Sequence, residues 1–323
     1  MREVSFYCPV RISQSPVIDG KLNDKCWGQV APYTATYEYF KPNPGPGALQ
    51  NTIKIAYDDK GFYLGIINYE KNPANIRKTI TNRDNGSIWT DDCAELYIDS
   101  QGQGVGFRRF TVNALGTFGD ILRIDGAVTR NDWNSNGTIF KTSINADNWT
   151  IEAFFPWEDL GRKAQKGDIW MFCHTRYAWP NGKFIGTTSS PGGNYSATGN
   201  FGYLYFSDTA KVDSGKITQI LMQRIAPPWC VKIDDKLISN QGKGLQSESI
   251  DTVIKREMNI INNMLPVKNI PANFRKEYDK LLAEYDQVKT ISELSVQKYR
   301  SLNTLASKIS KFQWKVKIAN QFN

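Results

Sequence analysis

One short stretch of the chain alternates regularly between apolar and polar residues. Within residues 93–99 every second position is apolar, which is typical of a strand with one face in a core and the other face open. Glu95 lies on the polar side, six residues after Trp89. A flat ring beside a fixed carboxylate suits a sugar, because the ring covers the C–H face and the acid accepts from the hydroxyls. Alternatively, Trp89 is a core residue and Glu95 a solvated strand position.

Similar short patterns recur along the first two hundred residues. Residues 51–57 and 62–69 alternate on either side of Asp58-Asp59-Lys60-Gly61, a typical hairpin sequence. Because few long helical patterns occur before residue 245, these segments predict a mainly β protein, an antiparallel β-sandwich. Four tryptophans in the hairpins and caps are expected in its core: Trp27, Trp149, Trp157 and Trp170.

The period becomes helical beyond Gly244. Apolar residues there recur at spacings of three and four in three segments, with two proline breaks between the first two and a third helix from near Ser292. We therefore predict a sandwich over residues 1–208, a linker with an extra strand over 209–244, and an α-helical hairpin or small bundle over 245–323. This helical region would pack on the sandwich, mediate self-association or contact another domain.

Composition narrows the class of protein. The chain has 323 residues, enough for two units, with 40% hydrophobic and 22% charged residues, as in soluble globular proteins. Of the net charge of +8, five charges come from the region after residue 247, where 13 basic residues face 8 acidic ones. The sandwich is thus close to neutral, and a nucleic-acid partner is not expected.

Short sequence signals exclude several other classes. The five cysteines form no Cys-x-x-Cys motif, which argues against a zinc ribbon and a covalently attached haem. No apolar run is long enough to span a membrane. The first residues lack the apolar core of a signal peptide, so for an exported protein we expect this chain to be the mature form or a trimmed one.

Seven segments, in order, resemble the family 9 carbohydrate-binding modules. They begin with Ile18-Asp19-Gly20-Lys21-Leu22-Asn23-Asp24 and Trp27, and continue with residues 56–64, 89–99, 110–116, 149–160, 167–176 and 200–204. The helical region has no counterpart in that module. The resemblance implies a calcium-containing β-sandwich that binds sugars without catalysis, as an accessory of glycoside hydrolases. It also implies a bacterial, extracytoplasmic polysaccharide-processing system.

The resemblance also implies a set of ligand contacts. In the sugar-binding members two tryptophan rings enclose the ligand, while a glutamate, arginines and an amide make hydrogen bonds. Trp89 matches the first ring and Glu95 the acid. Arg109 and Arg176 match the arginines, with Arg108, on the opposite face, as the second choice for the first of them. Either arginine could instead be the structural partner of a strand carboxylate.

The second ring is where this chain departs from the family pattern. Ser189 stands near the position where a tryptophan is frequent. The expected substitutes are Trp179, from the neighbouring Trp-Pro-Asn-Gly turn, and Tyr195. If neither supplies the second wall, the affinity for sugar would fall by about 1–2 kcal/mol.

A calcium site is also implied, with Asp91 and Asp92 as its candidate ligands. Their carboxylate oxygens suit calcium. However, the chain has no Asp-x-Asp-x-Asp loop, and adjacent acids are frequently just part of a solvated loop.

Three alternatives to sugar binding remain open at this point. A b-type haem carrier of the same superfamily would use Met171 and the single histidine, His174. A glycosidase would need paired carboxylates, for which Glu95, Asp99 and Glu152 are candidates without a predicted cleft. The third alternative is an assembly or scaffold module with a degenerate sugar site.

Overall fold

The structure is a computed structural model that describes residues 2–34, 36–40, 45, 47–125, 128–192, 197–207, 213–291 and 296–321. The chain divides into two compact units. The larger unit comprises residues 4–220, and the smaller one combines residues 1–3 with residues 221–323. The boundary falls within helix α2 (Ser214–Arg224), so the predicted linker over 209–244 contains regular structure instead.

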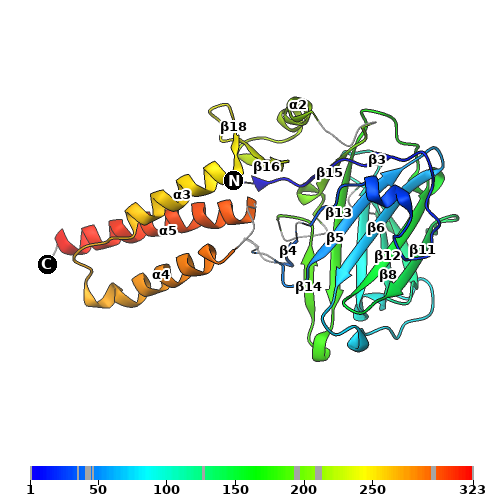
Figure 1. The fold of residues 1–323 in the computed structure, drawn as a ribbon, viewed down its shortest axis with the longest axis horizontal. Helices are drawn as coiled ribbons and strands as arrows, with labels where there is room; N and C mark the ends of the chain where they lie inside the picture. The colour runs from blue at the N-terminus through cyan, green and yellow to red at the C-terminus, as the bar shows by residue number, and fades with distance from the viewer. Residues whose placement is uncertain are drawn as a thin grey trace. The chain divides into compact units, whose positions relative to one another are not determined.

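The larger unit contains two sheets (Figure 1). The five-stranded sheet has the order β11 (Ile139–Ile144), β12 (Asn148–Pro156), β6 (Gly61–Tyr69), β5 (Asn51–Tyr57) and β3 (Val10–Arg11). The nine-stranded sheet runs through β10 (Val128–Arg130), β9 (Phe118–Ile124), β8 (Phe107–Asn113), β7 (Cys93–Asp99), β13 (Ile169–Ala178), β14 (Ile185–Thr188) and β4 (Tyr37–Glu38), while β15 (Gly202–Tyr205) joins β13 to β2 (Phe6–Tyr7).

The two sheets pack face to face as a sandwich, which confirms the predicted fold class. Most neighbouring strands are antiparallel; the β3–β5 and β15–β2 pairs are parallel. Apolar side chains from both sheets form one core, including Trp149 and Trp170. Short helical turns link the strands: η1 (Lys25–Gln29), η2 (Pro73–Asn75), η3 (Ile88–Thr90), α1 (Trp157–Leu160), η4 (Pro180–Gly182) and η5 (Thr198–Asn200).

A buried acid fixes the turn at Asp19 and Gly20 in the sandwich. Glu152 accepts hydrogen bonds from the backbone N–H groups of Asp19 and Gly20, both at 2.9 Å, and from Trp27 Nε1 at 2.8 Å. Gly20 has a φ of +89°, and a side chain there would meet the backbone of Thr142 at 2.8 Å. The turn therefore requires glycine. The four tryptophans expected in the core are all buried, as predicted.

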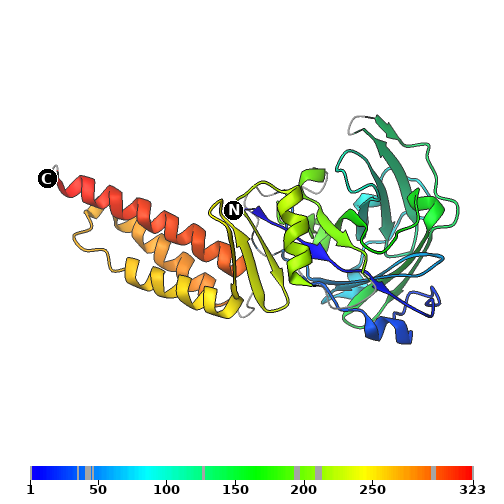
Figure 2. The ribbon, with the colours of Figure 1, turned by 90° about the horizontal axis from the view of Figure 1, so that it is seen from above.

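The smaller unit begins with a four-stranded sheet (Figure 2). Its order is β1 (Arg2–Glu3), β16 (Trp229–Ile233), β17 (Lys236–Asn240) and β18 (Leu245–Ser249). The strand β1 pairs with β16 in parallel, although more than two hundred residues separate them. The N-terminal end of the chain therefore completes a sheet that the sequence pattern had left as a linker.

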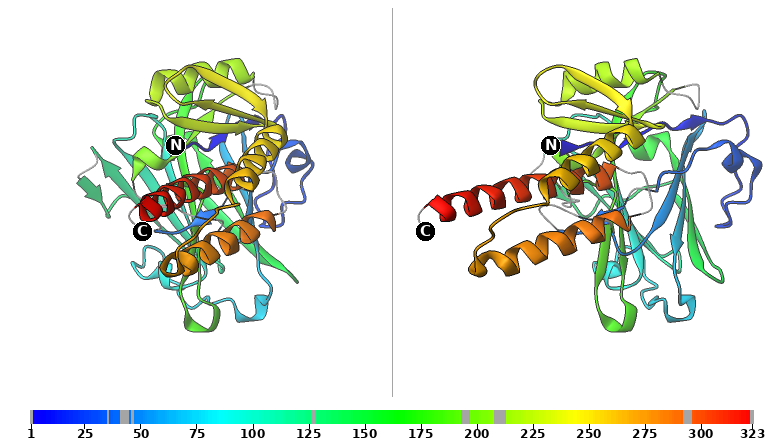
Figure 3. Two further views of the ribbon diagram at one scale, coloured as in Figure 1. Left: turned by 90° about the vertical axis from the view of Figure 1, so that its left-hand side faces the viewer. Right: turned by 60° about the vertical axis from the view of Figure 1, so that its left-hand side comes forward.

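Three helices complete the smaller unit: α3 (Ile250–Met264), α4 (Arg275–Lys289), which follows the turn η6 (Ala272–Phe274), and α5 (Val296–Gln321). Figure 3 shows them running side by side, and their buried apolar faces form one core. The predicted helical region is thus confirmed as a three-helix arrangement. None of the helices in the described residues combines the length and apolar character that crossing a bilayer demands. All five cysteines of the chain are buried.

Candidate functional site

Two tryptophans meet where β7 begins and β13 ends. Trp89 lies in η3, just before β7, and Trp179 directly follows β13, which pairs with β7. Their ring centroids are 5.9 Å apart and the ring planes are inclined by 46°. Trp179 Nε1 donates a 3.2 Å hydrogen bond to the carbonyl oxygen of Trp89. Trp89 nevertheless remains 47% exposed, so the pair presents a ring to solvent.

The two rings contact each other and do not face each other across a gap. A sugar held between two parallel rings needs about 7–8 Å between them, because each carbon–carbon contact takes about 3.5–4.0 Å. The observed separation and inclination leave no such slot. Trp89 and Trp179 therefore offer one continuous apolar surface, and their contact with a ligand stays a prediction.

Two further aromatic residues extend this surface. Phe184 packs on Trp179 at 5.2 Å between centroids and is 41% exposed. Tyr39 packs on Phe184 at 5.8 Å. The Arg77 guanidinium lies 5.5 Å from the centre of the Trp179 ring, within cation–π range. We refer to Trp89, Trp179, Phe184 and Tyr39 as the aromatic row.

The turn after β13 explains why Phe184 returns to Trp179. Asn181 and Gly182 both have left-handed backbone angles, with φ of +52° and +73°. Asparagine and glycine tolerate this conformation better than other residues. The turn reverses the chain after β13, and Phe184 directly precedes β14, which pairs with β13.

The carboxylate of Glu95 lies beneath this surface and is fully engaged. Its Oε2 accepts hydrogen bonds from the hydroxyls of Tyr97 at 2.5 Å and Tyr177 at 2.9 Å, and its Oε1 accepts from Thr111 at 3.1 Å. Arg109 Nε is 4.0 Å from Oε1. Strand β7 is buried on both faces, so the expectation of an open polar face was wrong.

A chain of hydroxyl groups connects Glu95 to the aromatic row. The hydroxyl of Tyr177 lies 3.0 Å from that of Tyr39, and the Tyr39 and Tyr177 rings pack edge to face at 5.3 Å. Because Glu95 holds Tyr177 and Tyr177 contacts Tyr39, the acid fixes one end of the row.

Of the two predicted arginines, only Arg109 shares a face with Glu95. Arg109 is directly opposite Tyr97 in the β7–β8 pair and its side chain is 35% exposed. Burial would lower the pKa of Arg109, but the Glu95 carboxylate and Tyr97 raise it overall, so the guanidinium stays charged. Arg108 points to the other face, where it lies over the Trp133 ring. The choice between the two arginines agrees with the predicted strand alternation.

Arg176 lies on the core face of β13. It has no exposed surface, and its Nη1 donates to the carbonyl oxygens of Gln50 at 3.0 Å and Tyr69 at 2.7 Å. Its Nη2 is 3.3 Å from Glu70 Oε2. Burial lowers the pKa of Arg176 to about 10, although Glu70 and Asp92 favour its charged form. This geometry agrees with the alternative that the sequence left open, in which the arginine is the structural partner of a carboxylate. Because Arg176 is buried, it does not reach an exposed ligand surface.

The two candidate calcium ligands have different surroundings. Asp91 is buried and accepts four hydrogen bonds, from the N–H and hydroxyl of Thr79, the N–H of Ile80 and the side-chain amide of Asn113. Burial opposes ionisation of Asp91, but these bonds prevail and lower its pKa. The carboxylate of Asp91 thus tethers the segment before η3, and its predicted role with calcium remains untested.

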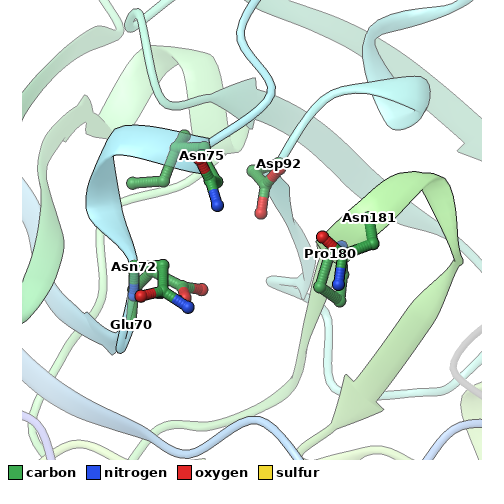
Figure 4. Close-up of a pocket in the computed structure, with 7 residues that line it drawn as sticks. Glu70, Asn72, Asn75, Asp92, Pro180 and Asn181 are labelled. Carbon is green, nitrogen blue, oxygen red and sulfur yellow. Dashed lines mark hydrogen bonds between the residues drawn. The ribbon is translucent and has the colours of Figure 1, made fainter.

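Asp92 opens into a small polar pocket of about 50 Å³ (Figure 4). Burial raises the pKa of Asp92 to about 6, although the hydrogen bond from the Arg77 N–H to Oδ2 and the charge of Arg176 oppose this rise. The lining residues come from three segments and are Glu70, Asn72, Asn75, Ile76, Asp92, Pro180 and Asn181. Carboxylate and amide oxygens of this kind fit calcium. The described residues contain no group of three or more histidine, cysteine or acidic ligands.

Comparison with known proteins identifies the family. Residues 18–209, more than half of the chain, match the family described as carbohydrate family 9 binding domain-like. The chain belongs to this family. A family 9 module from Caldicellulosiruptor kristjanssonii in complex with cellotriose shares 16% identity with a TM-score of 0.45, covering 69% of this chain and 98% of its own. A family 9 module from the same organism in complex with glucose shares 17% identity with a TM-score of 0.44, covering 64% and 99%. No curated protein matches in sequence.

Ser189 is the position in this family 9 domain where the sequence predicted that the second ring is missing. Ser189 is buried; its backbone N–H donates to the carbonyl oxygen of His174, and its Oγ accepts from the His174 N–H. It therefore continues the β13–β14 pairing. Tyr195, the other predicted wall, lies outside the described residues. Within the described part, Trp179 is the predicted substitute that contacts Trp89.

The two ligands proposed for haem do not converge in this family 9 domain. Met171 and His174 are three residues apart in β13, so they point to opposite faces of the sheet. His174 is fully buried, and burial together with the Arg176 charge lowers its pKa to about 3. The histidine is therefore a neutral core residue.

The carboxylates considered for glycoside cleavage are each occupied structurally. Glu95 binds hydroxyls of the sheet, and Glu152 holds the turn at Gly20. Asp99 accepts from the N–H groups of Gly102 at 3.0 Å and Gly104 at 2.7 Å, which fixes the glycine-rich turn after β7. Membership of family 9, a family of binding modules, agrees with a non-catalytic domain.

Sequence reasoning missed Phe184 and Tyr39. The available signal was the Pro-Asn-Gly turn between Trp179 and Phe184, because a tight reversal brings residues on either side of it together. Tyr39 gives no comparable signal, since its contact with Phe184 spans a long separation in sequence.

Proposed function

We propose that this chain binds carbohydrate without catalysis, through the aromatic row of its family 9 domain. The observation that carries the proposal is the exposed Trp89 ring, fixed against Trp179 in a member of a carbohydrate-binding family. An exposed indole covers the C–H face of a sugar ring, and the burial of both surfaces stabilises the complex. The half-exposed guanidinium of Arg109 is positioned to donate to sugar hydroxyls.

A binding titration tests this proposal. Tryptophan fluorescence and calorimetry would be recorded against cello-, xylo-, galacto- and manno-oligosaccharides. We expect saturable binding of at least one series and a loss of about tenfold or more in affinity for Trp89→Ala. Trp314→Ala is the matched control, since Trp314 is 61% exposed but lies in α5 of the other unit. No binding by folded wild-type protein, or equal losses in both variants, would contradict the proposal.

We further propose that the protein acts outside the cytoplasm, in a bacterial polysaccharide-processing system that includes glycoside hydrolases. Support comes from the family match alone. Fractionation of the cells that produce the protein tests this: it should be found in periplasmic, surface or secreted fractions. Recovery only with cytoplasmic markers would contradict it.

Calcium is the proposed structural cofactor, with Asp92 and Glu70 as its carboxylate ligands and neighbouring asparagines completing the set. The support is the oxygen-rich lining of the pocket in Figure 4. Bound calcium would neutralise the two nearby acids and link the segments after β6 and β13. Addition of calcium to chelator-treated protein should raise the unfolding temperature, and Asp92→Asn should abolish this rise. Asp132→Asn, at an exposed ion pair, should keep it.

A scaffold role is the second candidate, favoured by one surface of α5. Trp314 and Ile318 are exposed and one helical turn apart, so they form a small apolar patch. Light scattering of the full chain over a range of concentrations tests self-association. Association lost in Trp314→Ser/Ile318→Ser would favour this role, and a monomer at all concentrations would remove it.

A further inference from the structure

The aromatic row offers more than one stacking position. Trp89 and Phe184 both pack on Trp179, with centroid separations of 5.9 Å and 5.2 Å, and both are exposed by more than two fifths. A pyranose ring is similar in size to the six-membered ring of an aromatic side chain. Two exposed rings in succession can therefore contact two sugar residues of one chain.

The orientation of the rings limits the kind of polysaccharide that fits. The planes of Trp89 and Trp179 are inclined by 46°, and those of Trp179 and Phe184 by 57°. Rings that lie flush on a flat crystalline surface must share one plane. The observed inclinations instead suit a single chain whose sugar rings turn from one residue to the next.

The contact between Trp89 and Trp179 also bears on where along a chain the row binds. A slot between opposed rings encloses a single sugar and suits a chain end. Here the two rings touch, and the surface continues past Trp179 to Phe184. Among the residues that the structure describes, this open surface has no wall that requires the chain to end.

Glu95 contributes to the row indirectly. Its carboxylate is buried and already accepts from three hydroxyls, so it has little remaining capacity for a sugar hydroxyl. One of these donors, Tyr177, contacts the hydroxyl of Tyr39, whose ring packs on Phe184. The acid therefore holds Tyr177 and Tyr39 beneath the Phe184 end of the row.

We infer that the aromatic row binds consecutive sugar rings within a single non-crystalline polysaccharide chain, with Phe184 as a second stacking residue and Glu95 as a positioning residue. This inference rests on the proposed carbohydrate binding and specifies its ligand. Trp89 supplies the first stacking contact, and Phe184 acts only on ligands long enough to reach it.

A length series tests the role of Phe184. The affinity of cello-, xylo-, galacto- and manno-oligosaccharides of one to six residues would be measured for the full chain. In the series that binds, we expect affinity to rise from one residue to longer chains. Phe184→Ala should remove about 3- to 10-fold of this gain in affinity with chain length. Phe184→Leu provides a second variant that retains an apolar side chain. Borohydride reduction of the reducing end of the oligosaccharide should leave its affinity unchanged.

A double-mutant cycle tests the role of Glu95. If Glu95 acts through Tyr177, Glu95→Gln and Tyr177→Phe should each weaken the binding of long chains, and the double variant should be no weaker than the poorer single variant. Additive losses would show that Glu95 contacts the sugar directly.

Other outcomes separate this inference from the proposed function. Failure of wild-type protein to bind any series would overturn both. Binding that needs Trp89 but is independent of chain length, is lost on end reduction or is unchanged in Phe184→Ala would overturn the inference alone. Retention on crystalline cellulose without binding to soluble chains would also overturn it. The unfolding temperature of each variant establishes that it is folded.

Discussion

The two faces of the β7–β13 pair carry similar chemistry in very different surroundings. On the outer face, Arg109 and Glu95 lie 4.0 Å apart and Arg109 keeps a third of its side chain in water. On the core face, Arg176 and Glu70 lie 3.3 Å apart, and the side chain of Arg176 has no exposed surface. Each pair joins a strand arginine to a carboxylate, and both arginines were candidates for the same ligand.

The difference between the two faces is one of access to water. A buried guanidinium has lost its hydration and depends on protein acceptors, so its main effect is on the stability of the fold. A half-exposed one keeps free donor groups that a ligand can use. The comparison therefore predicts that the two arginines affect different measurements.

The largest effect is expected for Arg176→Met. This change leaves Glu70 and Asp92 without their buried cation and removes one donor from each of two carbonyl oxygens, those of Gln50 and Tyr69. We expect a loss of about 3–5 kcal/mol in the free energy of unfolding, measured by urea denaturation. Arg130→Met is the control, because its pair with Asp132 is exposed, and it should change the free energy of unfolding far less than Arg176→Met does. Equal, small losses in both variants would show that burial does not distinguish the pairs.

Arg109→Met should affect sugar affinity and leave the stability of the fold nearly unchanged. Glu95 keeps its three hydroxyl donors in this variant, so the free energy of unfolding should change by less than about 1 kcal/mol. The affinity for sugar should fall by about tenfold, the lower end for a hydrogen bond from a charged group. Arg11→Met, at an exposed ion pair away from the row, should leave affinity unchanged. A large loss of stability without loss of affinity would make Arg109 a second structural arginine.

The sequence predicted those parts of the fold that depend on neighbours along the chain. The hairpin of β5 and β6 follows from alternation on either side of Asp58-Asp59-Lys60-Gly61, and the structure confirms it. The helical period after residue 250 likewise gives the buried faces of α3, α4 and α5. The prediction of which β7 residues share a face was also correct, because the alternation of side chains along a strand decides it.

The parts that were missed depend on contacts between distant segments. Alternation indicates that Glu95 and Ala94 point to opposite faces, but not that both faces are covered. The pairing of β1 with β16 joins segments more than two hundred residues apart and leaves no local pattern in the sequence. At the site, Trp89 was identifiable from its motif, whereas Tyr39 joins the row only through the folded sheet.

The smaller of the two predicted effects on the free energy of unfolding is its dependence on pH through the carboxyl group of Asp92. Burial raises the pKa of Asp92 to about 6 in the folded chain, above the value of about 3.9 for an exposed aspartate. Between about pH 4 and 6 the folded protein therefore holds a proton that the unfolded chain has lost. The contribution of Asp92 to the free energy of unfolding therefore falls as the pH rises through that window and is constant above it. Asp92→Asn removes this dependence.

Urea denaturation of chelator-treated protein at pH 4, 5, 6 and 7 measures this effect. The stability of Asp92→Asn relative to wild type should rise by about 2 kcal/mol across the series. Asp132→Asn serves as the control, because its ion pair with Arg130 lowers the pKa of Asp132 to about 2, outside the window. Parallel pH profiles for wild type and Asp92→Asn would show that the carboxylate is ionised throughout. Calcium in the pocket of Figure 4 should flatten the wild-type profile, since a bound cation favours the charged carboxylate that burial disfavours.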